Sequence, residues 1–390
     1  MKRFIPLSVP NLKGNELHYV TNSIKSEWVS TGGQYISRFE DEFVKYSKAT
    51  NAVAVQSGTA ALHLCMIESG IGAGDLVIAP ALTFVAAVNP VRYVGAEPVF
   101  LDCDDSLCID PDILERYLEY ECRMYDGVCF DKSQSKPIKA IIVVHVFGNG
   151  ADMERIMELA KHYNLIVIED ASEAVGTFFI RGRYKSRMAG TIGDFGAYSF
   201  NGNKIITTGG GGMFVTKDAG SAGHARHLST QAKSDELYFD HDEIGYNYRM
   251  TNLQAALGLA QLEQLEEFIC IKRSNYEFYQ KLGVDLLPFV PYVRPNYWFY
   301  SFLSNDRDGL IEHLTKCDIQ ARPVWRLMHW LPMYKNCRAY LINKAMKYHS
   351  QVVNLPCSSN LRPCDVERVA DCVMEFQVAA HLHRQIRCTV

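Results

Sequence analysis

The chain has 390 residues, of which 48% are hydrophobic and 22% charged, and its formal net charge is −4. This length predicts two packed domains, and the composition is that of a globular protein rather than a disordered one. The small net charge and the lack of any dense run of Lys and Arg argue against nucleic-acid binding, and no apolar run is long enough to span a membrane.

Short apolar strands alternate with helices in the first half of the chain. Strands are predicted at 51–56, 76–79, 97–101, 140–146 and 166–169, and helices at 40–49, 60–68, 83–93 and 153–163. The polar segment 121–137 is predicted to be an excursion between a helix and the strand at 140–146. Such alternation is typical of a mostly parallel sheet between layers of helices, so the predicted fold class is α/β.

The pattern changes near residue 250, where a long helix over 252–268 leads into another helix. After this come three prolines, aromatic runs, and short strand and helix signals. We therefore expect a large domain over residues 1–265 and a smaller C-terminal α+β domain over residues 266–390.

Twelve cysteines are spread along the chain without a CxxC pair or a CxxC…HxxxH pattern. This dispersion favours reduced, mostly buried thiols, and the spacing predicts neither a disulfide framework nor a metal site. Residues 1–16 also lack the apolar stretch of a secretory signal. Both observations predict a cytoplasmic protein.

The first candidate for a functional motif is Ser57-Gly58-Thr59, at the junction of a predicted strand and helix. A helix N-terminus offers free N–H groups, and glycine lets the backbone approach a ligand closely, so the motif suits a phosphate. The alternative is that Ser57 or Thr59 is an ordinary N-cap.

The second candidate is Asp170, which directly follows the predicted strand at 166–169. Ligands of open parallel sheets bind beyond the carboxyl ends of the strands, so this carboxylate can face a cofactor. The alternative is an aspartate that only caps the following helix.

The third candidate is Lys204, in a loop that begins at Ser199 and ends in four glycines at 209–212. Aromatic and small neighbours on both sides suggest a confined ammonium group. Confinement lowers the pKa of a lysine and makes it a candidate for Schiff-base chemistry. The alternative is a solvated surface lysine.

The three features together fit one cofactor, pyridoxal 5′-phosphate (PLP). Lys204 would bind its aldehyde, Ser57-Gly58-Thr59 its phosphate, and Asp170 would keep its ring nitrogen protonated, so that the ring can draw electrons from a substrate. This chemistry requires no metal.

Longer motifs carry a resemblance to a known family. They are SEWVSTGGQYISRFEDEF (26–43), SGTAALHL (57–64), PALTFVAAVNPVRYVGAEPVFLDCD (80–104), IEDASEAVG (168–176), GDFGAYSFNGNKIITTGGGGM (193–213) and GYNYRMTNLQAALGLAQL (245–262). With these motifs the chain resembles the DegT/StrS-type nucleotide-sugar aminotransferases, which have the fold type I of PLP enzymes. The motifs are most similar to those of the branch that makes 4-amino sugars on UDP carriers for legionaminic acid and bacillosamine pathways. The resemblance implies a part in the synthesis of cell-surface polysaccharides.

The resemblance also implies a role for each matching residue near the cofactor. Lys204 matches the Schiff-base lysine that moves the substrate proton, and Asp170 matches the carboxylate on the ring nitrogen. Glu173 matches a residue near the cofactor's O3′ atom, and Phe84 matches a ring-stacking aromatic, unless it packs in the core. The implied phosphate contacts are Ser57, Gly58, Thr59, Ser199 and Asn201.

Asn247 and Arg249, in the motif GYNYRM, match residues that reach the cofactor phosphate of a neighbouring subunit. The resemblance therefore implies a homodimer with shared active sites. The residues alone allow a simpler interpretation, in which GYNYRM is only a turn before a helix.

The resemblance also implies two segments that border the substrate. The residues are Trp28, Ser30 and Gly32 in one segment, and Arg322 and His329 in the other. Arg322 would bind either a pyrophosphate or the carboxylate of the amino donor. We expect the nearby Trp325 and Trp330 to be core aromatics.

The implied reaction moves an amino group from L-glutamate to a keto group, most simply at C4, of a nucleotide-linked deoxy sugar. The similarity of the motifs favours UDP as the nucleotide. Ping-pong kinetics through pyridoxamine phosphate are expected. A PLP-dependent sugar dehydratase of the same fold is an alternative, but such enzymes carry His where this chain has Lys204. An NAD-dependent sugar dehydrogenase is another, but no GxGxxG follows the first strand.

Overall fold

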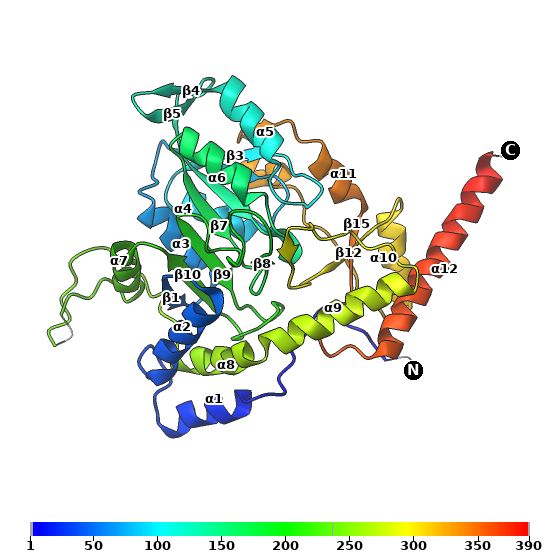
Figure 1. Ribbon diagram of the computed structural model, residues 1–390, viewed down its shortest axis with the longest axis horizontal. Helices are drawn as coiled ribbons and strands as arrows, with labels where there is room; N and C mark the ends of the chain where they lie inside the picture. Colours follow the sequence, from blue (N-terminus) through cyan, green and yellow to red (C-terminus); the bar gives the residue numbers. More distant parts are fainter. Residues whose placement is uncertain (1–2, 236, 389–390) are drawn as a thin grey trace.

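A computed structural model describes residues 3–235 and 237–388 of the chain. The centre of the molecule is one large sheet with the strand order β1-β10-β9-β7-β6-β2-β3-β14 (Figure 1). These strands are β1 (Asn51–Val55), β2 (Leu76–Pro80), β3 (Glu97–Leu101), β6 (Pro137–Val144), β7 (Ile166–Asp170), β9 (Phe195–Ser199), β10 (Gly212–Thr216) and β14 (Ala339–Tyr340). Neighbouring strands from β9 to β14 are parallel, whereas β10 is antiparallel to β1 and to β9. The predicted mostly parallel sheet is confirmed, with an antiparallel edge.

Helices cover the sheet. In this part of the chain they are α1 (Glu16–Lys25), α2 (Gln34–Ser47), α3 (Gly58–Glu68), α4 (Asn89–Tyr93), α5 (Pro111–Arg116), α6 (Met153–His162) and α7 (Ala219–Ser229). Helix α3 packs on β9 and β10, α2 packs on β1, and α6 lies against β7. Strands β2 and β10 are buried along their whole length, as expected for strands with cover on both faces.

The polar excursion predicted at 121–137 contains a β-hairpin, which the sequence interpretation did not identify. Strands β4 (Cys122–Tyr125) and β5 (Val128–Asp131) pair with each other, and β5 also pairs with the start of β6. The turn is Asp126-Gly127, with φ of 49° and 74°. Asp-Gly is a strong hairpin signal because both turn residues need positive φ. The exposed side chains of β4 hide the strand pattern that would have revealed it.

The predicted helix at 83–93 is divided. A 3-10 turn covers Val85–Ala87, and α4 begins only at Asn89. Pro90 stands in the first turn of α4, where its missing N–H is not needed. The proline therefore starts a second helix instead of continuing the first.

The C-terminal part is a smaller α+β assembly. A three-stranded sheet has the order β12 (Tyr300–Leu303), β15 (Val352–Leu355) and β13 (Arg322–Pro323), and the two-residue strands β8 (Phe178–Phe179) and β11 (Val293–Arg294) pair separately. Helix α8 (Asn252–Glu263) packs on α1 and α2 and so belongs with the large part. The helices of the C-terminal part are α9 (Leu265–Lys281), α10 (Arg307–Lys316), α11 (Lys344–Gln351) and α12 (Pro363–Cys388). The predicted long helix ends at Glu263, and α9 starts at the expected domain boundary. Strand β14 nevertheless joins the large sheet from the far side of this boundary, and the division at residue 265 stays a prediction.

Two general expectations can be checked against the described part of the chain. No helix there is both long and apolar enough to cross a bilayer. The eleven cysteines from Cys65 to Cys372, whose side chains are described, are free, and seven of them are buried. The prediction of mostly buried thiols is therefore confirmed for these residues.

Candidate active site

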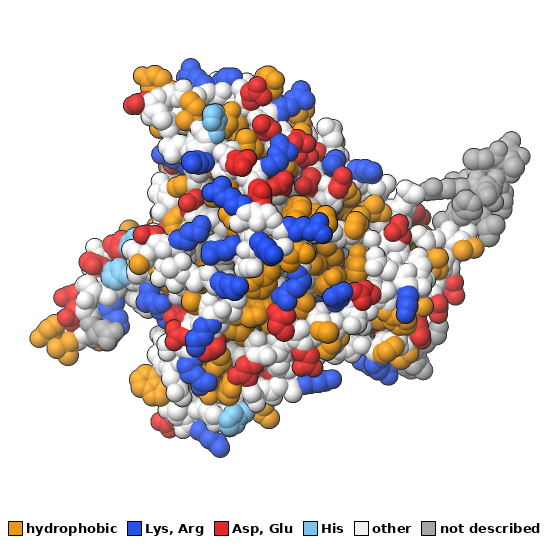
Figure 2. All heavy atoms as spheres, viewed as in Figure 1, with side chains coloured by type: hydrophobic (Ala, Val, Ile, Leu, Met, Phe, Trp, Pro, Cys, Tyr) orange, Lys and Arg blue, Asp and Glu red, His pale blue; other side chains and the backbone are white. Residues whose placement is uncertain are grey.

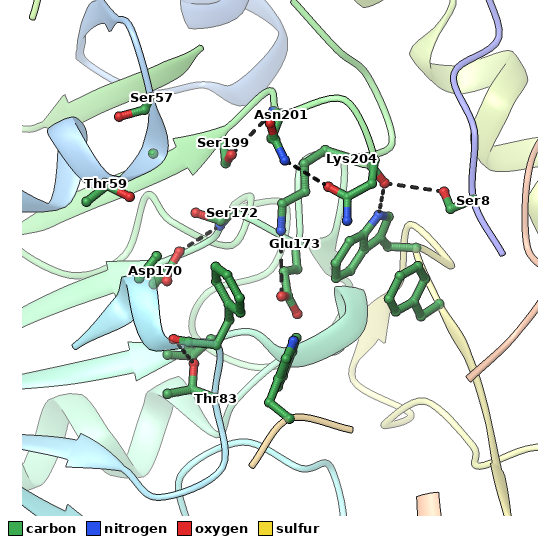
Figure 3. A pocket seen from close by; sticks show the side chains of 18 of the residues that line it. Ser8, Ser57, Thr59, Thr83, Asp170, Ser172, Glu173, Ser199, Asn201 and Lys204 are labelled. Carbon is green, nitrogen blue, oxygen red and sulfur yellow. Dashed lines mark hydrogen bonds and ion pairs between the residues drawn. The ribbon is translucent and has the colours of Figure 1, made fainter. Parts of the chain in front are cut away.

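A cavity of about 540 Å³ lies at the carboxyl end of the parallel strands (Figure 3). Its walls include Val144, Asp170 and Ser199, which are the last residues of β6, β7 and β9, and Gly58, the first residue of α3. Ligands of parallel sheets bind at this edge, because strand ends and helix N-termini meet there. The C-terminal part closes the cavity from the other side with the loop around Trp298.

The N-terminus of α3 forms one end of the cavity. Ser57 caps the helix, since its Oγ accepts a hydrogen bond from the N–H of Ala60 at 3.0 Å. A Cβ on Gly58 would lie 2.8 Å from the Cβ of Ser199 and 3.1 Å from the Oγ of Ser172. Only glycine leaves this space open, so the helix end and two hydroxyls form a cradle that suits a phosphate. The capping alternative for Ser57 is therefore correct, and the cap leaves the space beside Gly58 open.

Asp170 lies at the floor of the cavity and is 6% exposed. Its Oδ1 accepts a hydrogen bond from the N–H of Ser172 at 3.0 Å. The preceding residue, Glu169, faces the opposite side of the sheet, because side chains alternate along a strand. Glu169 is fully buried there and accepts hydrogen bonds from His145 at 2.8 Å and from the N–H of Gly193 at 2.6 Å. Of these two adjacent carboxylates, only Asp170 has access to the cavity.

Lys204 points into the cavity, and its side chain is 12% exposed. Its Nζ lies 3.6 Å from Oε1 of Glu173 and 4.1 Å from the centroid of the Trp298 ring. The indole N–H of Trp298 donates to the carbonyl of Asn203 at 2.8 Å, which holds the ring against the lysine loop. The alternative of a solvated surface lysine is therefore wrong. The carboxylate and the ring face both stabilise the charged ammonium.

Glu173 is a buried carboxyl group beside this ammonium. Burial raises its pKa to about 7, although Lys204 and a hydrogen bond from the N–H of Phe147 at 2.8 Å act in the opposite direction. Phe147 has a φ of 57°, and this left-handed conformation presents its N–H to the carboxyl group. A group with this pKa can exchange a proton near neutral pH.

An aromatic wall lies opposite the lysine. Phe84 is 50% exposed, so it does not pack in the core as one alternative held. Its ring centroid lies 6.2 Å from that of Trp325, which lies 4.9 Å from that of Phe147. Trp330 is 37% exposed, so its prediction as a core aromatic is wrong, whereas Trp325 is partly buried and packs against the core while it also lines the cavity.

The cavity thus brings together most of the residues predicted for the cofactor. Its lining includes Ser57, Gly58, Thr59, Phe84, Asp170, Glu173, Ser199, Asn201 and Lys204, and from the substrate set Arg322. The Arg322 side chain belongs to β13 and is exposed at the outer rim.

The other predicted substrate residues lie elsewhere in this chain. Trp28 is 62% exposed in the connection between α1 and α2, and its carbonyl accepts a hydrogen bond from Asn252 at 2.7 Å. Ser30 and Gly32 lie in the same connection. His329 lies in a 3-10 turn outside the cavity lining, where burial lowers its pKa.

Asn247 and Arg249 also lie away from the cavity of their own chain. Arg249 donates to Oε1 of Glu40 at 2.6 Å and to the carbonyl of Ala54 at 3.2 Å, so its guanidinium is held by its own subunit. Asn247 is exposed. The segment does precede a helix, because Thr251 and Gln254 form a capping box at the start of α8.

Several cavity residues were not anticipated from the sequence. Ser172 follows Asp170 by two positions, so its proximity to the same strand end could have been inferred. Trp298 lies in the aromatic run NYWFY, but nothing local indicates that it reaches Lys204, which is 94 positions earlier. Asn354 and Gln320 reach the cavity only through the packing of the C-terminal part.

Comparisons with known proteins agree with this geometry. The model of the DegT/DnrJ/EryC1/StrS aminotransferase family matches residues 10–374. A GDP-perosamine synthase of Escherichia coli O157:H7 is 38% identical over 96% of this chain and 99% of its own. EpsN of Bacillus subtilis (strain 168), whose name describes a pyridoxal phosphate-dependent aminotransferase, is 37% identical over 86% of this chain and 84% of its own. The crystal structure of the aminotransferase TlmJ from Streptoalloteichus hindustanus is 26% identical, with a TM-score of 0.87 over 97% of this chain and 100% of that chain.

Proposed function

From the premise that the chain belongs to the DegT/DnrJ/EryC1/StrS aminotransferase family, we propose that it transfers the amino group of L-glutamate to the C4 keto group of a nucleotide-linked deoxy sugar. Membership makes it a PLP-dependent aminotransferase of nucleotide-sugar pathways with the fold type I architecture. The observation that carries the finer proposal is the placement of Lys204, Asp170 and the N-terminus of α3 around one cavity.

The residues of the cavity fit PLP. The cradle at Gly58, which a Cβ would fill, would hold the phosphate. Asp170 would hold the proton of the ring nitrogen, and the exposed face of Phe84 would contact the ring. When bound, PLP supplies an electron sink for the bond that is broken at the substrate Cα.

Lys204 and Glu173 would handle the protons of the reaction. Lys204 must lose its positive charge before it can remove a proton from the substrate Cα, and a carboxyl group 3.6 Å away with a pKa of about 7 can exchange that proton. The face of Trp298 keeps water from one side of the lysine. We propose that the same Nζ removes the proton from glutamate and returns one to the sugar carbon in the second half of the reaction.

The nucleotide is the least determined part of the substrate. The motif wording favours UDP, whereas a relative that is 38% identical over almost its whole length is named GDP-perosamine synthase. We propose GDP as the first nucleotide to test and UDP as the second. Arg322 at the rim is a suitable group for the pyrophosphate or for the carboxylate of glutamate.

We further propose a homodimer in which Asn247 reaches the cofactor phosphate of the partner. The segment between α7 and α8 projects from the body of the molecule, with apolar side chains at its tip (Figures 1 and 2). Leu237, Tyr238, Phe239 and Ile244 are between 66% and 86% exposed. Exposed apolar groups of this size are typical of an interface.

We also propose that the protein is cytoplasmic.

The two alternatives have less support. A sugar dehydratase of this fold would carry His at position 204, where a lysine contacts Glu173. An NAD-dependent dehydrogenase would place its dinucleotide on a glycine-rich turn after the first strand, whereas β1 is followed here by Gln56-Ser57-Gly58.

The proposal is tested by a panel of 4-keto sugars linked to GDP, UDP and dTDP, with L-glutamate as donor. We expect the purified holoenzyme to convert the GDP-linked or the UDP-linked sugar and to release 2-oxoglutarate. Reduction with borohydride followed by peptide mapping should place the cofactor on Lys204. Labelling elsewhere, or turnover that requires NAD, would contradict the proposal.

The shared site is tested by mixing two inactive variants, Lys204→Ala and Asn247→Ala. In a mixed dimer, one site receives an intact Lys204 and an intact Asn247 from different chains. Random reassembly should therefore restore roughly a quarter of the wild-type activity. Sites that are complete within one chain would show no recovery above the sum of the two variants.

A further inference from the structure

Three side chains that can bind a metal meet between two helices, and none of the three lines the cavity. His313 and Cys317 lie on one face at the end of α10, because they are four positions apart. Cys372 faces them from α12, which packs against α10. Nothing in the aminotransferase chemistry uses this cluster.

The spacing of these groups is close to that of a tetrahedral site. One nitrogen of His313 and the two sulfurs lie within 4.8 Å of one another. Zinc–sulfur bonds of about 2.3 Å and zinc–nitrogen bonds of about 2.0–2.1 Å give tetrahedral edges of roughly 3.5–3.8 Å. Small rotations of the side chains would therefore bring all three groups to a single ion.

A second observation points to a ligand at this position. Nε2 of His313 is buried and has no hydrogen-bond partner among the described residues. A buried polar atom without a partner costs free energy, and a metal ion would satisfy it. The imidazole also packs against Phe376, with ring centroids 5.6 Å apart, which limits its reorientation.

We propose that His313, Cys317 and Cys372 bind one Zn²⁺ ion, with a water molecule in the fourth position, and that the ion fastens α12 to α10. Imidazole and thiolates are ligands that select zinc over magnesium or calcium. Two thiolates balance the charge of the divalent ion. His313 and Cys317 are only partly buried, which leaves a path for the ion and for the water.

The thiols must lose their protons when the ion binds. Without metal, burial and a hydrogen bond with the neighbouring Cys317 raise the pKa of Cys372 above that of an ordinary thiol. Zinc displaces such protons from its sulfur ligands. Arg368, whose charge acts on Cys372, favours the thiolate.

The site is tested with the full-length holoenzyme, purified in the presence of a non-thiol reductant and treated with EDTA. Co²⁺ is the probe, because its visible absorption reports tetrahedral coordination by thiolates. We expect one Co²⁺ per chain, displacement by one equivalent of Zn²⁺, and a zinc-dependent rise of Tm of roughly 2–4 °C at saturation. His313→Gln and Cys317→Ser, both at partly buried positions, should abolish the absorption and the rise of Tm.

Two matched variants control for adventitious binding. Cys364→Ser removes an exposed thiol from the start of α12, and His227→Ala removes the histidine of an exposed His227, Asp242 and Glu243 cluster. Both should bind Co²⁺ as the wild type does. Absence of the thiolate spectrum in the wild type, equal binding by His313→Gln, or loss of binding in His227→Ala would overturn the proposal. So would a Cys317–Cys372 disulfide in protein purified separately without reductant, detected by alkylation and mass spectrometry.

Discussion

The inner wall of the cavity and its outer rim are built in different ways. The inner wall consists of Gly58, Asp170, Ser199 and Lys204, which lie at or directly beyond the ends of adjacent sheet strands or at a helix start. The rim consists of Phe84, Trp325 and Arg322, on connections and on a two-residue edge strand.

The main sheet therefore positions the residues of the inner wall but not those of the rim. Strand pairing places Asp170 and Ser199 at the ends of two neighbouring strands, β7 and β9, so the sheet fixes the positions of both residues. The rim is more exposed, since Phe84 is 50% exposed and Arg322 is also accessible. Rigid scaffolds with variable loops let a fold keep one chemistry while its substrates change. The inner wall should therefore determine turnover, and the rim should determine the choice of substrate.

The largest expected effect is that of Lys204→Ala. No other amine lines the inner wall, so the proton transfer at the substrate Cα loses its base. We expect kcat to fall by about 10⁴-fold or more, at the upper end of general-base effects. Single-turnover assays with glutamate check this, and turnover close to that of the wild type would disprove the role of Lys204.

The next largest effect is expected for Asp170→Asn. The asparagine Oδ1 can still accept the hydrogen bond from Ser172, but the side chain no longer carries the charge that holds a proton on the cofactor ring. We expect kcat to fall by roughly 10²–10³-fold, the scale of a lost electrostatic partner. Tm should change little. A parallel loss of Tm and activity would show that Asp170 only caps the following segment.

Glu173→Gln tests the buried carboxyl group through the pH dependence of stability. The pKa of Glu173 is raised from 4.5 to about 7 in the folded protein, so folding favours its protonated form. This contribution is complete below pH 4.5 and is lost as the pH rises through about 7. The cofactor-free variant should therefore gain stability relative to the wild type between these values, by up to about 3 kcal/mol.

Urea unfolding at several pH values measures this difference. Glu119→Gln is the matched control. Glu119 is exposed and lies outside the sheet, so this variant should follow the wild type. If the curves of Glu173→Gln and the wild type run parallel from pH 4.5 to 8, the raised pKa of Glu173 is refuted.

Gly58→Ala tests the phosphate cradle. The added Cβ would lie 2.8 Å from the Cβ of Ser199, so the helix end or the strand end must shift. Overpacking of this kind costs about 1–3 kcal/mol, and we expect the cofactor affinity to fall by roughly 10–100-fold. Gly72→Ala is the control, since a Cβ there meets no atom within 4 Å. Equal affinities for the two variants would contradict the cradle.

The inner wall could be predicted because its residues have local signals. Asp170 directly follows a buried strand, Ser57-Gly58-Thr59 begins a helix, and both positions are at the edge where parallel sheets bind ligands. The alternation of strands and helices also predicted that the sheet is mostly parallel. These features depend on neighbours in the sequence, which a pattern can reveal.

The remaining features depend on contacts that no local pattern contains. Trp298 reaches Lys204 across 94 positions, and Trp325 lines the cavity while it also packs against the core. His313 and Cys317 are four positions apart, but Cys372 joins them only through the packing of two helices, so a search for paired cysteine spacings misses the cluster. The hairpin at Asp126-Gly127 is the exception, because its turn signal was present and was outweighed by the polar side chains around it.

The rim gives the smallest expected effect and the sharpest contrast with the inner wall. Arg322 is exposed at the cavity edge, and its backbone is fixed by pairing with β15. Its guanidinium can bind an anionic group of the sugar nucleotide or of glutamate, so we expect Arg322→Gln to raise KM for one of these substrates by about 10-fold, the scale of one charge-assisted contact. The value of kcat should change by less than about 3-fold, since the residue does not touch the reacting atoms. Unchanged KM values for both substrates would show that the rim does not recognise charge. A loss of kcat as large as that of Asp170→Asn would show that rim and inner wall act as one unit, which would remove the distinction between them.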